Sequence, residues 1–208
     1  MLSDVNLPLI LFAAFIGAAS PGPSTLTIAG MSMNAGRRYG VALSLGVLTG
    51  SWFWSVCAAF GLGAIMLANA WAFEVMRYLG AGYLLYLAYK SARSAFSAKP
   101  TAVAGITTTS LSKAYSKGLA LHLTNPKAIL FFGSLFSIAV PPGSSLTALV
   151  VVICAVGIQS TLIFVGYALL FSSAPMVTTY MKLRRWFEAV FAVAFGIAGF
   201  KILTARLG

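Results

Sequence analysis

The sequence predicts an all-α integral membrane protein of six transmembrane helices, arranged as two inverted three-helix repeats with a broken first and fourth helix. Three observations lead to this fold class: an apolar composition, proline-containing breaks inside two apolar segments, and basic residues that gather in alternate turns. Of the 208 residues, 60% are hydrophobic and 8% are charged, and the mean hydropathy is +0.93. Because a soluble domain needs more polar surface, we expect residues 1–208 to form one membrane domain.

Six apolar segments follow one another along the chain. We expect them to span the membrane at about residues 7–35, 41–68, 71–89, 117–140, 146–171 and 186–203. The first is longer than a hydrocarbon core of about 30 Å requires, at about 1.5 Å per helical residue. It is therefore either one tilted, broken span or a partly re-entrant pair. The polar segment 91–115 is expected to be a cytoplasmic linker between repeat one (1–90) and repeat two (116–208).

The net charge of +11 comes from basic residues in short clusters between the apolar segments. This placement is typical of a membrane-orientation signal and not of a nucleic-acid-binding face. Most of the 14 lysines and arginines lie in the turns after the first, third and fifth spans, which predicts cytoplasmic turns there and both termini outside. With three spans per half, the second half enters from the opposite side, as in inverted-repeat transporters. No basic stretch precedes the first apolar segment, so we expect it to be retained.

Two apolar segments contain prolines at their centres, about half the chain length apart. A proline in a membrane helix removes a backbone donor and clashes with the preceding turn, so it breaks or kinks the helix. The two breaks read Ser20-Pro21-Gly22-Pro23 and Asn125-Pro126-Lys127. Ser20 and Asn125 are good N-cap residues, and each precedes a proline suited to the first helical position. We therefore predict that new half-helices begin at Pro21 and at Pro126.

The breaks predict a site for an anionic group. The N-terminus of a half-helix presents free N–H groups and about half a positive charge. In inverted halves, two such ends converge near the membrane midplane, which suits a carboxylate. Lys127 adds a cation whose burial costs several kcal/mol and which an anionic substrate would offset. The alternative is that the prolines are structural kinks, and that Lys127 pairs with Glu188 or extends to the membrane surface.

Further polar residues lie near the breaks or in the middle of the second and fifth spans, the matching helices of the two halves. The predicted substrate-binding residues are Ser20, Pro21, Gly22, Pro23, Ser24, Thr49, Ser51, Asn125, Pro126, Lys127 and Gln159. Serine, threonine and glutamine also connect membrane helices by hydrogen bonds, so each of these side chains has a structural alternative.

Groups that could carry a proton are scarce. His122 lies about one turn before the second break and could titrate near physiological pH, although a lone histidine is more often structural. The three acids, Asp4, Glu74 and Glu188, are all expected near span ends. The sequence therefore predicts a binding site but indicates no proton carrier at the midplane.

Several of these runs resemble the LysE/RhtB family of amino-acid exporters, in the same order along the chain. They are Ser20-Pro21-Gly22-Pro23, Gly36-Arg37-Arg38-Tyr39-Gly40, the pair Gly46 and Gly50, residues 77–87 and residues 125–132. The resemblance implies a small inner-membrane carrier that uses the proton-motive force to export amino acids of the homoserine, threonine and leucine type. Residues 136–142 depart from the family pattern.

We therefore expect a multi-pass secondary transporter in the bacterial inner membrane, with an amino acid and membrane lipid as partners. No enzymatic activity, cofactor, metal or nucleic acid is expected, and a homo-oligomer is left open. A thiol oxidoreductase using Cys57 and Cys154 is one alternative, but neither cysteine has an activating environment. A divalent-cation exporter is another, but the sequence offers no midplane cluster of metal ligands.

Overall fold

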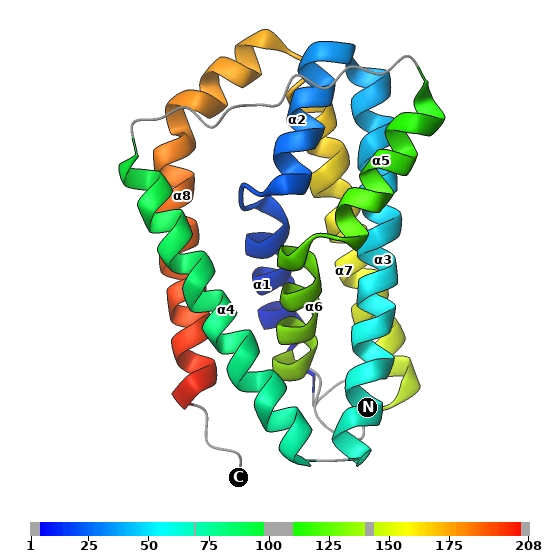
Figure 1. Ribbon diagram of the computed structural model, residues 1–208, viewed down its shortest axis with the longest axis vertical. Coiled ribbons are helices and arrows are strands. Elements are labelled where there is room, and N and C mark those ends of the chain that lie inside the picture. The colour runs from blue at the N-terminus through cyan, green and yellow to red at the C-terminus, as the bar shows by residue number, and fades with distance from the viewer. Residues whose placement is uncertain (1–4, 69, 98–109, 140–143, 205–208) are drawn as a thin grey trace.

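The computed structural model describes residues 5–68, 70–97, 110–139 and 144–204, and their regular structure is entirely helical. The helices are α1 (Leu7–Ala19), α2 (Pro23–Ala35), α3 (Arg37–Ala68), α4 (Ala70–Phe96), α5 (Leu111–Leu123), α6 (Pro126–Ala139), α7 (Leu146–Leu170) and α8 (Ala174–Thr204). They form an elongated bundle in which α1 and α6 lie between the α4–α8 pair and the α3, α5 and α7 group (Figure 1). The start of α1 and the end of α8 lie at the same end of this bundle.

Within the described residues, two helices are long and apolar enough to cross a membrane: α3 over Arg37–Gly61, and α7 over Leu146–Leu170. The pair α1 and α2 also passes this test when taken together, with a bend of 53° at the break. Helix α6 is apolar but shorter over Pro126–Phe136. The described structure confirms the prediction of an all-helical fold, and these helices are consistent with a membrane protein. The count of six spans goes beyond what helix length and hydropathy establish.

The first break differs from its predicted geometry. Ser20 is the C-cap of α1 and not an N-cap, since its N–H donates to the carbonyl oxygen of Ile16 at 3.0 Å. Helix α2 begins at Pro23, and Gly22 is its N-cap in an extended conformation. The physical reason is that a residue before proline disfavours the helical region, so Pro23 keeps Gly22 out of the helix. Pro21 restrains Ser20 in the same way.

The second break matches the prediction. Helix α5 ends at Leu123, and α6 begins at Pro126 directly after Asn125. The Oδ1 atom of Asn125 accepts a hydrogen bond from the backbone N–H of Lys127 at 3.0 Å. Asn125 therefore caps the first turn of α6, and the proline occupies the first helical position, where its missing N–H costs nothing.

Polar ends of several helices extend beyond the predicted spans. Only Gly36, with a φ of 93°, separates α2 from α3, so most of the expected basic turn is helical. Residues 91–96 continue α4, Leu111 begins α5 inside the expected linker, and α8 begins at Ala174, well before 186. The predicted bounds followed hydropathy, whereas lysine and arginine are good helix formers and extend helices into polar surroundings.

Gly46 and Gly50, one of the runs that resemble the exporter family, lie at helix contacts. A Cβ atom on Gly46 would lie 2.0 Å from the backbone oxygen of Tyr115, and one on Gly118 would lie 2.1 Å from that of Leu43. The backbones of α3 and α5 therefore touch through glycines on both helices. Gly50 lies against a side chain instead: a Cβ atom there would be 3.0 Å from the Cβ of His122. This close contact holds the His122 side chain beside the second break.

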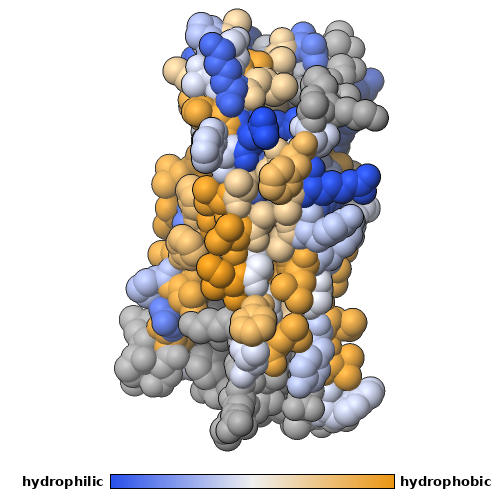
Figure 2. Space-filling model, turned by 90° about the vertical axis from the view of Figure 1, so that its left-hand side faces the viewer, coloured by the Kyte–Doolittle hydropathy of each residue, from blue (hydrophilic) through white to orange (hydrophobic). Residues whose placement is uncertain are grey.

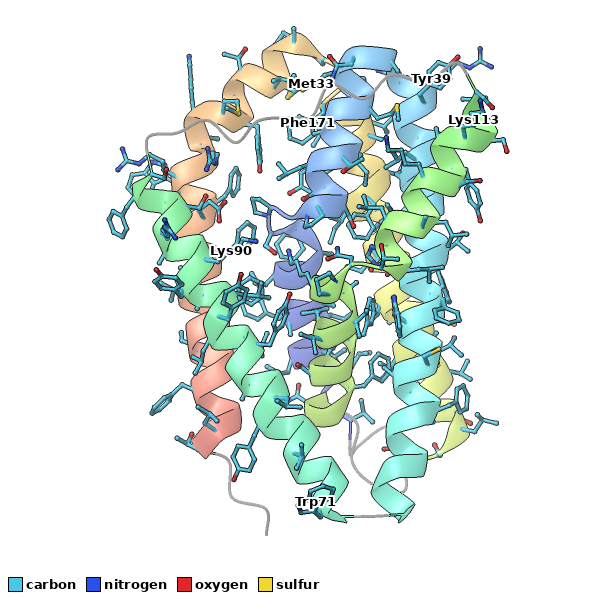
Figure 3. The ribbon with its side chains drawn as sticks, viewed as in Figure 1. Met33, Tyr39, Trp71, Lys90, Lys113 and Phe171 are labelled. Atoms are coloured by element: carbon cyan, nitrogen blue, oxygen red, sulfur yellow. The ribbon has the colours of Figure 1, made fainter. Side chains whose placement is uncertain are left out.

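The surface separates polar and apolar residues along the bundle. On the face of α4 and α8, hydrophilic residues gather toward one end, with hydrophobic residues below them (Figure 2). Tyr39 and Lys113 lie at this polar end, whereas Trp71 lies at the opposite end (Figure 3). Trp71 has 69% of its surface exposed, which fits a tryptophan at a membrane interface.

Candidate functional site

The two breaks lie side by side in the middle of the bundle and are joined by Lys127. Its Nζ donates a hydrogen bond to the backbone oxygen of Ser20 at 3.0 Å and also contacts the Ser20 hydroxyl. A Cβ atom on Gly22 would lie 3.2 Å from both Cδ and Nζ of this lysine. The absence of a side chain at Gly22 therefore lets Lys127 cross the first break.

The ammonium group of Lys127 lies in a more favourable electrostatic environment than the sequence indicated. Lys127 is in the first turn of α6, where a cation opposes the helix dipole, but its ammonium group lies at the C-terminal end of α1, where a cation is favoured. The Tyr167 hydroxyl donates to the Ala19 oxygen at 2.6 Å. Side chains of α6 and α7 thus satisfy carbonyl groups that the end of α1 leaves open.

The hydrogen bonds of Lys127 match neither of the structural alternatives considered for it, which were pairing with Glu188 and extension to the membrane surface. Glu188 is near enough to interact electrostatically with the lysine, but its Oε1 accepts a hydrogen bond from the Ser94 hydroxyl at 2.9 Å. The ammonium group of Lys127 is directed to Ser20 and not toward the membrane surface. Glu188 was expected near a span end, and the structure adds that its side chain is buried, with only 5% of its surface exposed.

A second set of hydrogen bonds connects the breaks through Ser24. The Nδ2 of Asn125 donates to the Ser24 hydroxyl at 3.3 Å. The same hydroxyl lies 3.0 Å from Nδ1 of His122. Ser24 is in the first turn of α2, so this network joins the start of α2 to the end of α5 and the start of α6.

A cavity of about 40 Å³ lies where these helices meet. Of the predicted residues it is lined by Ser20, Gly22, Ser24, Ser51, Asn125 and Lys127. A single ordered water needs about 10–15 Å³ of such volume, so the cavity has room for a few waters and is smaller than an amino acid. An amino acid would require the helices around the breaks to move apart.

Other predicted residues lie outside this cavity. Pro23 and Pro126 are exposed, and Pro21 faces a small neighbouring pocket between α2, α7 and α8. The Thr49 hydroxyl lies 2.9 Å from that of Tyr115, and Gln159 donates through Nε2 to the Leu11 oxygen at 3.0 Å. Both side chains thus connect helices, which fits their structural alternative.

The cavity also has an aromatic and apolar wall that the sequence reasoning missed. Besides the polar residues His122 and Ser160, it is lined by Thr25, Phe131, Phe132, Val156 and Phe164, together with small residues of α1. The positions in α6 could have been found from helical spacing, since residues three and four apart share a helix face. Ala128, Phe131 and Phe132 have this spacing.

Two features bear on the alternatives of metal and thiol chemistry. Among the described residues, no group of three or more His, Cys, Asp or Glu side chains is placed to hold a metal ion. Cys57 and Cys154 are both free thiols with exposed side chains. Neither observation supplies a specific argument for a metal exporter or a thiol oxidoreductase.

Comparison with known proteins shows the family to which the chain belongs. The LysE type translocator family matches residues 15–206, which include both breaks, and the chain belongs to this family. It is 26% identical over 193 residues to the threonine efflux protein of Salmonella typhi, covering 92% of this chain and 94% of that protein.

Two further relatives have similar extent. The chain is 32% identical over 181 residues to the leucine efflux protein of Enterobacter sp. (strain 638), covering 87% of this chain and 85% of the relative. It is 26% identical over 189 residues to an uncharacterized membrane protein of Haemophilus influenzae, covering 89% of this chain and 90% of the relative. No solved structure matches the chain.

Proposed function

We propose that this protein is a secondary transporter that exports a small amino acid, or a close derivative, across the bacterial inner membrane. The observation that carries the proposal is Lys127, a partly buried cation that joins the two helix breaks beside a cavity. Membership of the LysE type translocator family supports it, as do relatives named threonine and leucine efflux proteins. The substrate is accordingly of the threonine, homoserine or leucine type.

We propose a six-span topology in which α1 with α2, and α5 with α6, each form one broken span. In support, α2 and α6 both begin at the central breaks and run toward opposite ends of the bundle (Figure 1). The remaining spans are α3, α4, α7 and α8, which gives two inverted repeats, one ending with α4 and the other beginning with α5. The basic end of the bundle faces the cytoplasm.

The carboxylate of the substrate binds between the breaks in this proposal. It replaces Ser20 as the partner of the Lys127 ammonium group, and the first turn of α2 offers N–H groups at Ser24 and Thr25. A charge-assisted hydrogen bond of this kind is about twice as strong as one between neutral groups. The apolar part of the substrate lies against Phe131, Phe132 and Phe164.

The charge of the site favours a substrate with an uncharged side chain. Lys127 is a cation, and none of the residues that line the cavity is acidic. A lysine or arginine substrate would bring a second positive charge close to Lys127 without a carboxylate to receive it. The charge of the site therefore disfavours basic amino acids, in agreement with relatives named threonine and leucine efflux proteins.

The proposal is tested by measuring efflux from cells loaded with a panel of amino acids. Cells that produce the wild-type protein should release threonine, homoserine or leucine faster than cells that produce Lys127→Ala, with lysine and arginine unaffected. Lys182→Ala is the matched control, because Lys182 is exposed on α8 and should leave efflux unchanged. Equal efflux from wild-type and Lys127→Ala cells at equal protein levels would refute the proposed site.

A further inference from the structure

We propose that His122 binds the substrate directly, by donating a hydrogen bond from its Nε2–H group to the carboxylate held by Lys127. The inference rests on the proposed function and assigns a second residue to the same site. It begins with a buried histidine that the structure places among the residues lining the cavity.

The His122 ring is held in one place. It lies in the last turn of α5 with 4% of its surface exposed. Its Nδ1 is 3.0 Å from the Ser24 hydroxyl, and it forms a T-shaped pair with the Phe164 ring at a centroid distance of 6.0 Å. On another side, a Cβ atom on Gly50 would lie 3.0 Å from the Cβ of His122. A ring fixed by three neighbouring helices presents its second nitrogen in a defined direction.

The hydrogen bonds around Ser24 determine which ring nitrogen carries the hydrogen. The backbone N–H of Lys127 requires an acceptor, so the side-chain oxygen Oδ1 of Asn125 faces it. The side-chain nitrogen Nδ2 of Asn125 must then donate to the Ser24 hydroxyl. The Ser24 hydroxyl hydrogen then needs an acceptor of its own. Within the described parts of the chain, Nδ1 of His122 is the remaining partner of that hydroxyl. The hydroxyl therefore donates to Nδ1, and the neutral ring carries its hydrogen on Nε2.

The Nε2 atom is buried without a hydrogen-bond partner in the described residues. Buried donors in native proteins are nearly always paired, so an orphaned one beside a cavity indicates a ligand. His122 and Lys127 are close enough to interact electrostatically. A carboxylate has two oxygens, and these match two donors: one oxygen is bound by the Lys127 ammonium group and the other by the imidazole N–H. In this arrangement His122 holds the substrate and transfers no proton.

The test uses two amides that imitate different parts of the ring. Asparagine at position 122 can keep the contact with Ser24 near Nδ1 but has no group at Nε2, whereas glutamine reaches the position of Nε2. We expect His122→Asn to weaken the apparent affinity for L-threonine, L-homoserine or L-leucine by about 10- to 100-fold, the usual loss for a hydrogen bond to a charged group. His122→Gln should retain much of the affinity.

A carboxylate-free probe separates binding from a structural role. The corresponding amino-acid amide should inhibit wild-type efflux weakly, and His122→Asn should not weaken its binding further. Thermal unfolding of each purified variant in detergent checks folding. The proposal is overturned if His122→Asn binds the amino acid as wild type does, or if it weakens the amino acid and its amide equally. Failure of the wild-type protein to export any amino acid would instead refute the proposed function.

Discussion

Lys127 and Ser20 are joined by a hydrogen bond of 3.0 Å between the ammonium group and the backbone oxygen, across 107 residues of sequence. This bond makes the two helix breaks one structural unit. The lysine stabilises the open end of α1 in the described conformation, and a substrate carboxylate would compete with that carbonyl group for the same cation. Binding of substrate and opening of the first break are therefore coupled in the proposed mechanism.

Gly22 controls the approach of Lys127 to the first break. In Gly22→Ala, the new Cβ atom would lie 3.2 Å from Cδ and Nζ of Lys127, so the lysine must shift. We expect efflux to fall several-fold while the protein still folds, because a flexible side chain can move at small cost. Amino-acid efflux at matched expression measures this. Gly82→Ala is the control, since nothing lies within 4 Å of its Cβ position, and equal loss in both variants would contradict the expectation.

Gly118 is predicted to be essential for packing and not for substrate binding. A Cβ atom there would lie 2.1 Å from the backbone oxygen of Leu43, and backbone cannot move aside as a side chain can. Overpacking of this kind costs about 1–3 kcal/mol. Gly118→Ala should therefore unfold at a lower temperature in detergent. Gly166→Ala, with open space at its Cβ, should unfold as the wild type does, and a normal melting temperature for Gly118→Ala would show that the helices can separate freely.

Glu188 is predicted to hold α8 against α4. Its carboxylate accepts from the Ser94 hydroxyl, which in turn accepts a hydrogen bond from Arg184 at 2.8 Å. Removing one partner so that a buried group such as the Glu188 carboxylate loses its hydrogen bond costs about 1–3 kcal/mol, and less where the network is partly exposed. Glu188→Ala should lower thermal stability, and Glu188→Gln should lower it less because the amide oxygen can still accept from Ser94. Identical melting temperatures for Glu188→Ala and wild type would remove this role.

The two cysteines are predicted to be dispensable. Cys57 and Cys154 are exposed and unpaired, on helices whose cavity-lining positions are other residues. The double variant Cys57→Ser, Cys154→Ser should export amino acids at the wild-type rate and keep its melting temperature. Efflux is measured with and without a thiol reductant. A strong loss of function in the double variant would revive a role for thiol chemistry.

The sequence was sufficient to predict both breaks but only one of their geometries. Asn125 and Pro126 present a single proline after a good cap, and the helix begins where expected. The first break contains two prolines, and the restriction that Pro23 places on Gly22 moves the start of α2 two residues later. That rule is local and could have been applied to the sequence alone.

Contacts between distant segments were harder to predict. Ser51 lines the cavity while Thr49, two residues earlier on the same helix, contacts Tyr115. Sequence gives the angle between two such side chains but not which neighbour each one meets. The same limit applies to Lys127, whose partner is a backbone carbonyl group. A backbone acceptor is present at every position and leaves no signal in the residue types.

The way α1 ends has a consequence for biosynthesis. The side chains that meet its last carbonyl groups are Lys127 and Tyr167, which lie 107 and 148 residues beyond their partners, Ser20 and Ala19. A ribosome delivers the first half of the chain to the bilayer before either side chain exists. Until both side chains have been made, those carbonyl groups must be satisfied by water or lipid headgroups. In the proposed topology, the first break can therefore enter the membrane interior only when the second half arrives.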